Sequence, residues 1–209
     1  MDITKEYVDE AIRQANAGHP ADLPHVSGLT SFKVRRLLNW LCKPEGTNYL
    51  EIGTHQGATL IGALWDNPHV TASCIDMWTC EGAQGDTHRH HLEANLAEFL
   101  PGREVNIVED DMFTLDLGRL IPGVNVYFFD GPHTREGQYQ AFARYDPVFA
   151  DRFVTLVDDW KWEEPREETR RAFEDLGYQV EADWVLEARF TRDEEEWWND
   201  LYVAIVEKR

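Results

Sequence analysis

The chain has 209 residues, 43% of them hydrophobic and 12% aromatic, so it is long and apolar enough to bury the core of one domain and is not intrinsically disordered. Asp and Glu total 39 against 20 Lys and Arg, and the formal net charge of −19 excludes non-specific binding to nucleic acid or to an anionic membrane. No apolar run approaches the roughly 18 residues of a membrane span. The first residues show no secretory signal and there are only three cysteines, so we expect a cytoplasmic protein without a disulfide scaffold.

Two helices are predicted before the first strand. Apolar residues recur at helical spacing over 4–17, and the pattern stops at Gly18. A second helix is predicted from an N-cap at Thr30 or Ser31, and Pro44 ends it. We expect these helices to form an N-terminal extension that packs on the remainder of the chain.

From residue 48 onward, apolar runs of strand length alternate with helical patterns. Strands are expected at 48–52, 70–75, 104–108, 124–129, 154–157, 184–190 and 201–206. Helices are expected at 58–65, 87–99, 135–145 and 165–176. The alternation predicts a Rossmann-like α/β fold, in which a doubly wound, mostly parallel seven-stranded sheet ends in a C-terminal antiparallel hairpin. We expect a single domain over 1–209, with 1–43 as its helical extension.

Acidic residues gather at the ends of the predicted parallel strands. In an open parallel sheet, ligands bind beyond the carboxyl ends of the strands. All five parallel strands end in acid, namely Glu51, Asp76, the pair Asp110–Asp111, Asp130, and the pair Asp158–Asp159. We therefore expect the binding site at this edge of the sheet.

The first strand is followed by a glycine loop, Glu51-Ile-Gly-Thr-His-Gln-Gly57. Gly53 permits a tight turn and a close approach of a ligand to the backbone, although packing alone also accounts for such glycines. Asp76 ends the next strand, where an acid accepts the hydroxyl groups of a ribose. The loop departs from the G-x-G-x-x-G fingerprint and carries no basic residue for a pyrophosphate. It therefore favours a nucleoside without phosphate, such as S-adenosylmethionine, whose cationic groups suit a pocket rimmed by Glu51, Asp76 and Asp130.

The strand ends YLEIGTHQGAT, IDMW, FDGPHTREG and LVDDW resemble those of class I S-adenosylmethionine-dependent methyltransferases, over about residues 48–159. More narrowly, they resemble the macrocin- and novobiocin-type sugar O-methyltransferases and the cephalosporin-hydroxylase-like proteins. The resemblance implies that the cofactor is held by Glu51, Gly53, Thr54, Gly57, Asp76, Met77, Trp78, Asp111, Met112 and Asp130. Asp110 stands where many relatives have glycine, which leaves open whether Asp110 or Asp111 faces the adenine. Trp78 is expected either to stack on the adenine or to be a core aromatic.

Asp130, Asp158 and Asp159 follow two strands that we expect to be neighbours. Three converging carboxylates repel one another, and a hard divalent cation relieves that repulsion, so Mg²⁺ or Ca²⁺ is expected here. The resemblance favours magnesium. In the alternative interpretation, one Asp caps a helix and another faces solvent. His133 lies three residues after Asp130 and is expected to act with it in catalysis, as general base or positioner of the acceptor, unless it only bonds to the loop backbone.

The leading hypothesis is a metal-assisted O-methyltransferase that acts on a small hydroxylated metabolite or sugar. We expect a small-molecule acceptor, no nucleic-acid or membrane partner, and a possible homodimer. Of the adjacent Trp197 and Trp198, one side chain can line a pocket while the other meets a partner chain. Two alternatives remain: an NAD-type oxidoreductase, which predicts the absent G-x-G-x-x-G, and a cofactor-binding protein without methyl transfer.

Overall fold

The computed structural model of the protein describes residues 3–78 and 83–209. Within them, seven strands form a single sheet in the order β3-β2-β1-β4-β5-β7-β6. The strands are β1 Asn48–Ile52, β2 Thr71–Asp76, β3 Asn106–Glu109, β4 Val124–Phe129, β5 Phe149–Val157, β6 Gln179–Leu186 and β7 Leu201–Glu207. Strands β1 to β5 pair in parallel, and β7 runs antiparallel between β5 and β6. The predicted fold class is confirmed.

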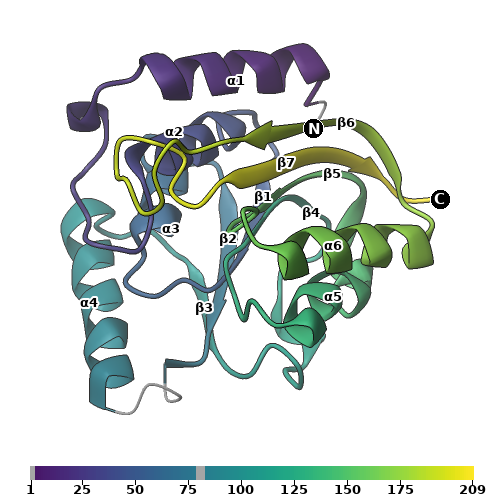
Figure 1. The fold of residues 1–209 in the computed structure, drawn as a ribbon. Helices are drawn as coiled ribbons and strands as arrows, with labels where there is room; N and C mark the ends of the chain where they lie inside the picture. Colours follow the sequence, from purple (N-terminus) through teal and green to yellow (C-terminus); the bar gives the residue numbers. More distant parts are fainter. Residues whose placement is uncertain (1–2, 79–82) are drawn as a thin grey trace.

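Helices cover both faces of this sheet (Figure 1). They are α1 Lys5–Ala17, α2 Phe32–Leu41, α3 Ala58–Leu64, α4 Ala83–Phe99, α5 Arg135–Ala143 and α6 Glu163–Leu176, with short 3₁₀ turns at Pro20–Asp22, Leu117–Arg119 and Asp146–Val148. Helices α5 and α6 pack together on one face, while α1, α2, α3 and α4 lie on the other side (Figure 1).

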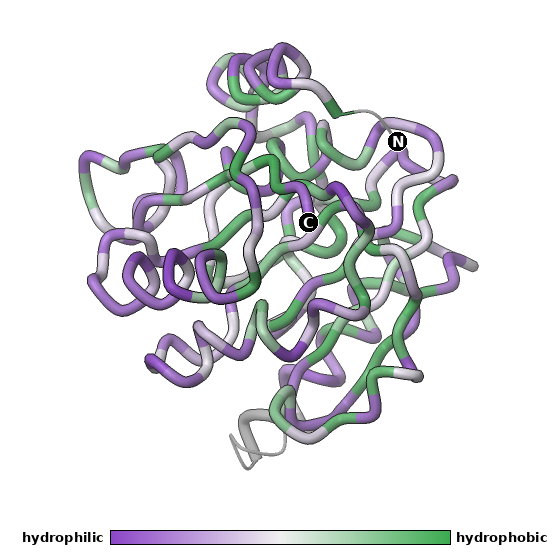
Figure 2. The backbone as a smooth tube through the Cα atoms, turned by 90° about the vertical axis from the view of Figure 1, so that its right-hand side faces the viewer, coloured by the Kyte–Doolittle hydropathy of each residue, from purple (hydrophilic) through white to green (hydrophobic). Residues whose placement is uncertain are grey.

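The sheet is buried on both faces because alternate residues of each strand enter different cores. In β4, Val126 and Phe128 pack with the helices α1 to α4, whereas Tyr127 and Phe129 pack with α5 and α6. All six residues of β4 are buried. This two-sided burial explains why the parallel strands appear in the sequence as continuous apolar runs. Figure 2 shows hydrophobic segments passing through the interior, with hydrophilic segments prominent in the outer loops.

The N-terminal helices are tied to distant parts of the chain. Helix α1 packs on α2, and the Tyr7 hydroxyl donates to the carbonyl of Trp40 at 2.6 Å. The indole of Trp184 in β6 donates to Asp9 at 2.8 Å. The side chain of Ser31 caps α2 by accepting from the Val34 amide, which resolves the choice between the two predicted N-caps in favour of Ser31.

Two strands, β5 and β6, differ from the predictions by more than two residues, for physical reasons. Strand β5 begins at Phe149 rather than 154, because Phe149 pairs with Val124 of β4 and β7 pairs with β5 as far back as Arg152. Strand β6 covers Gln179–Leu186 rather than 184–190; it is an edge strand with mostly exposed side chains, so it lacks an apolar run. No helix of the described residues is long and apolar enough to cross a membrane.

Candidate functional site

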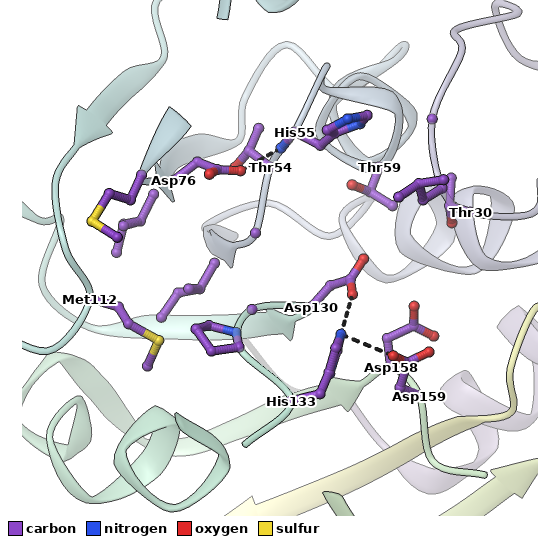
Figure 3. A pocket seen from close by; sticks show the side chains of 18 of the residues that line it. Thr30, Thr54, His55, Thr59, Asp76, Met112, Asp130, His133, Asp158 and Asp159 are labelled. Carbon is purple, nitrogen blue, oxygen red and sulfur yellow. Dashed lines mark hydrogen bonds and ion pairs between the residues drawn. The ribbon is translucent and has the colours of Figure 1, made fainter. Parts of the chain in front are cut away.

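A cavity of about 550 Å³ opens at the carboxyl ends of the parallel strands (Figure 3). The register of the sheet aligns Val108, Ile75, Ile52, Phe129 and Val157 in one row across β3, β2, β1, β4 and β5. The residues that follow this row are Glu109, Asp76, Gly53, Asp130 and Asp158. Strand register therefore brings the predicted strand-end residues to one edge.

Most of the predicted site residues line this cavity. They are Gly53, Thr54, Asp76, Met77, Asp111, Met112, Asp130, His133, Asp158 and Asp159. Glu51, Gly57 and Trp78 are not among the lining residues. Asp110 and Asp111 both line the cavity, so its lining alone does not choose between them.

Gly53 makes the tight turn out of β1. Its φ is +93°, and a Cβ built on it would lie 1.9 Å from the carbonyl oxygen of Asp130. The Gly53 amide donates to the Ile75 carbonyl at 2.9 Å, and the Asp130 amide donates to the Ile52 carbonyl at 2.9 Å. Glycine is therefore required here by the backbone of β4, in addition to any approach of a ligand.

Gly57 and Trp78 support the first loop from outside the cavity. Gly57 precedes α3 with a φ of +86°, and a Cβ there would lie 2.5 Å from Leu92 Cδ1 of α4. The Trp78 side chain is 1% exposed and packs in the core, where its indole donates to the His55 carbonyl at 2.8 Å. Of the two expectations for Trp78, stacking on the adenine or packing in the core, the structure agrees with packing in the core.

Glu51 is fully buried and does not line the cavity. The Tyr49 hydroxyl donates to its Oε2 at 2.6 Å. Burial raises the pKa of Glu51 to about 8, against the opposing effect of the hydroxyl groups of Tyr49, Thr59 and Thr54. Within the described residues, neither Glu51 Oε1 nor the buried Thr54 Oγ1 makes a well-formed hydrogen bond. Buried polar atoms of this kind are normally satisfied, so they indicate a missing polar partner.

Asp76 faces the cavity beside the first loop (Figure 3). Its Oδ2 accepts from the backbone amide of His55 at 2.7 Å, and His55 adopts a left-handed φ of +49°. On the neighbouring strand end, the Asp110 amide donates to the Asp76 carbonyl at 3.2 Å, and the Asp110 side chain is paired with Arg119. Asp111 Oδ1 accepts from the Phe113 amide at 2.8 Å.

His133 bridges two of the strand-end carboxylates (Figure 3). Its Nε2 lies 2.9 Å from Asp159 Oδ2 and 3.5 Å from Asp130 Oδ1. Asn199 donates to the other oxygen of Asp159 at 2.8 Å. Asp158 is 2% exposed, and its Oδ1 is buried without a hydrogen-bond partner among the described residues.

The electrostatics of this cluster follow from burial and from the bridge. Burial raises the pKa of Asp130 to about 6 although His133 opposes the shift, and burial raises that of Asp158 well above its usual range. Burial acts to lower the pKa of His133, but hydrogen bonds to Asp130 and Asp159 outweigh it and raise the pKa to about 10. At neutral pH, His133 is therefore an imidazolium whose Nε2 donates to carboxylates, which does not suit it to accept a proton.

The expected metal site is not supported. Among the described residues, no group of three His, Cys, Asp or Glu side chains is placed to hold a metal ion. Asp130, Asp158 and Asp159 do converge, but His133 Nε2 lies between Asp130 and Asp159 and supplies the positive charge that Mg²⁺ or Ca²⁺ was expected to supply. The residues present do not fit a divalent cation in this arrangement.

Two segments without regular secondary structure complete the cavity, and the sequence did not predict that they lie together. Gly28, Leu29 and Thr30 precede α2, while Arg192, Trp198 and Asn199 belong to the β6–β7 connection. The choice between the adjacent tryptophans is settled, because Trp198 lines the cavity and Trp197 packs in the core. No sequence pattern indicated the rest of this set, since neither segment has a periodicity.

Comparisons with known proteins found structures of the same fold but no related sequence. No protein-family model and no curated protein matches the chain. Among solved structures, it is similar to an O-methyltransferase from Bacillus cereus in complex with S-adenosylhomocysteine, with a TM-score of 0.61 and 14% identity over 98% of this chain and 92% of that one. A candidate RNA methyltransferase from Pyrococcus horikoshii gives a TM-score of 0.55 and 15% identity over 96% of each chain. TrmN from Thermus thermophilus gives a TM-score of 0.59 and 18% identity over 95% of this chain, which spans only 52% of TrmN.

At these identities the similarity establishes the fold, which is that of the class I S-adenosylmethionine-dependent methyltransferases. The predicted resemblance is confirmed at this level. Because an O-methyltransferase and a candidate RNA methyltransferase share the fold, the fold alone does not identify the methyl acceptor.

Proposed function

We propose that the chain is an S-adenosylmethionine-dependent methyltransferase that methylates a hydroxyl group of a small molecule. The observation that carries the proposal is the cavity at the strand ends, which joins the Gly53 turn, Asp76 and the buried Thr54 Oγ1, an atom without a well-formed hydrogen bond. The fold supports it, because a solved structure of the same fold holds S-adenosylhomocysteine. When bound, S-adenosylmethionine would supply an electrophilic methyl group on a sulfonium.

The residues of the cavity fit that cofactor from one end to the other. Thr54 Oγ1 lines the cavity without a well-formed hydrogen bond, and it would accept from the ammonium of the methionine part. The buried Glu51 would act through Thr54, whose hydroxyl is close enough to oppose the rise in the pKa of Glu51. Asp76, held by the His55 amide, would accept from the ribose hydroxyls. Met77, Met112 and Asp111 line the cavity beyond Asp76 and would enclose the adenine.

The acceptor would bind near Asp158 and His133. There the described residues leave Asp158 Oδ1 without a partner, so a second hydroxyl of the acceptor, other than the reacting one, can donate to it. His133, held between Asp130 and Asp159, would orient these carboxylates and act as a positioning residue. Asp130, whose pKa is raised to about 6 by burial, is the group we propose to take the acceptor proton on its carboxylate. Most of the rate gain would come from holding the two reactants in line.

A small acceptor is favoured over RNA by charge. The chain carries a net charge of −19, and six aspartates line the cavity. Such a surface repels a phosphate backbone. An NAD-type oxidoreductase is disfavoured because the glycine loop carries no base to meet a pyrophosphate.

The proposal is tested by following the release of S-adenosylhomocysteine from labelled S-adenosylmethionine in the presence of catechols, sugars and unmodified tRNA. Transfer to a hydroxylated small molecule, greatly reduced in Asp130→Asn, is the expected result. Asp116→Asn serves as the control, because Asp116 only caps the turn Leu117–Arg119. Transfer to tRNA alone would contradict the small-molecule assignment. S-adenosylmethionine binding without transfer to any acceptor would favour the non-catalytic alternative.

A further inference from the structure

The β6–β7 connection, residues 187–200, is held in place over the acceptor end of the cavity. The Phe32 amide at the start of α2 donates to the Glu194 carbonyl at 2.9 Å. Lys33 Nζ forms an ion pair with Glu196 at 3.0 Å. The Arg192 amide donates to the Trp198 carbonyl at 3.0 Å, which closes the turn on itself. The connection is therefore attached both internally and to the segment on the opposite side of the cavity.

The backbone of this connection is strained where it meets the cavity. Arg192 and Trp198 have left-handed φ values of +58° and +57°, and both residues line the cavity. An isolated bridge between Asp193 and Trp198 joins the two sides of the turn. Left-handed conformations of non-glycine residues are disfavoured and persist where the surrounding structure fixes them, often at functional sites.

Arg192 is the single Arg or Lys among the cavity-lining residues that the structure describes. Four acidic residues follow it directly, Asp193 to Glu196. Lys33 pairs with Glu196, and Asp193 accepts from the Glu195 amide. Arg192 is exposed and lines the cavity, and no ion pair or side-chain hydrogen bond of Arg192 occurs within the described residues, so its guanidinium is available to a ligand.

Three of the aspartates that line the cavity have other hydrogen-bond or ion-pair partners. Asp159 accepts from Asn199 and contacts His133, which also contacts Asp130. Asp110 is paired with Arg119. These three aspartates have partners of their own, and no ion pair of the described residues joins Arg192 to a carboxylate.

We propose that Arg192 binds a carboxylate group of the methyl acceptor, so that the substrates are hydroxylated carboxylic acids. This inference rests on the proposed function and specifies its acceptor. A planar guanidinium forms paired hydrogen bonds with a planar carboxylate. A carboxylate is favoured over a phosphate because one guanidinium carries a single positive charge, which balances a carboxylate but not a phosphate dianion, and the excess charge would be repelled by the aspartates of the cavity. The acceptor would lie with its carboxylate at Arg192, its reacting hydroxyl at Asp130 and a second hydroxyl at Asp158.

The experiment uses the full chain saturated with S-adenosylhomocysteine and two matched probes, 3,4-dihydroxybenzoate and 3,4-dihydroxybenzamide. Calorimetric titration is expected to give at least about tenfold tighter binding of the acid than of the amide. Arg192→Gln should abolish that preference, and Arg192→Lys should retain part of it. Arg189→Gln should leave the preference intact, because it removes the same charge from an exposed residue of the same connection that does not line the cavity.

The binding of S-adenosylhomocysteine separates the two proposals. If the unmodified chain does not bind it, the proposed function fails. If it binds but the acid and the amide bind alike or not at all, the assignment of Arg192 fails while the proposed function stands. A tenfold or larger loss of S-adenosylhomocysteine affinity in Arg192→Gln would also overturn the assignment, because the guanidinium would then hold the carboxylate of the cofactor.

Discussion

Replacing Gly53 with alanine should destabilise the protein far more than the same change at a glycine of similar conformation. The φ of +93° at Gly53 costs an alanine roughly 1–2 kcal/mol. The added Cβ would lie 1.9 Å from the Asp130 carbonyl oxygen and 2.4 Å from its carbon. Both atoms are backbone, so no side chain can rotate away, and separating two central strands adds about 1–3 kcal/mol. The sum of about 2–5 kcal/mol is a large share of the roughly 5–15 kcal/mol by which a domain is stable.

Gly102 provides the matched control. Its φ is +76°, and a Cβ built on it meets nothing within 4 Å, so Gly102→Ala should cost only about 1–2 kcal/mol. Urea unfolding of both variants, followed by circular dichroism at constant m-value, gives the difference between them. Equal midpoints for Gly53→Ala and Gly102→Ala would refute the argument that the backbone of β4 requires a glycine at this turn.

Three further predictions concern the acidic cluster. Asp158→Asn should raise the thermal midpoint at pH 8 more than at pH 4, because a buried carboxyl with a raised pKa stabilises the fold only while protonated; a lower midpoint at pH 8 would contradict it. The stability that His133 contributes should be complete below about pH 6.5 and lost as the pH rises through about 10, its raised pKa; thermal unfolding beside His133→Gln measures this, and a constant difference between pH 6 and pH 10 would refute the bridge. The thermal midpoint in millimolar Mg²⁺ should equal the midpoint in chelator, because His133 lies between Asp130 and Asp159. A midpoint several degrees higher in Mg²⁺ would support the metal-site hypothesis.

The sequence predicted best where burial alone determines the structure. Strand β1, Asn48–Ile52, and strand β4, Val124–Phe129, have the expected bounds, because a strand buried on both faces is mainly apolar and stands out in the sequence. Strand β6 was misplaced because an edge strand carries no such constraint. The convergence of Asp76, Asp130 and Asp158 was predictable from topology, since parallel strands in register end at one edge.

The remainder of the site depends on contacts between segments far apart in the sequence. The Phe32 amide donates to the Glu194 carbonyl, and no local sequence pattern predicts this contact. This contact attaches the β6–β7 connection, which contains the cavity-lining Arg192. The bridge of His133 to Asp159 depends on the geometry of two loops, so spacing predicted the proximity of His133 to the acids but not its charge.

Calorimetric titration of the chain with S-adenosylhomocysteine tests the central claim most directly. We predict one site per chain, with affinity reduced at least about tenfold by Asp76→Asn. Affinity should be unchanged by Glu109→Gln, whose side chain is a register neighbour of Asp76 but does not line the cavity. Binding of NADH with no binding of S-adenosylhomocysteine would contradict the account.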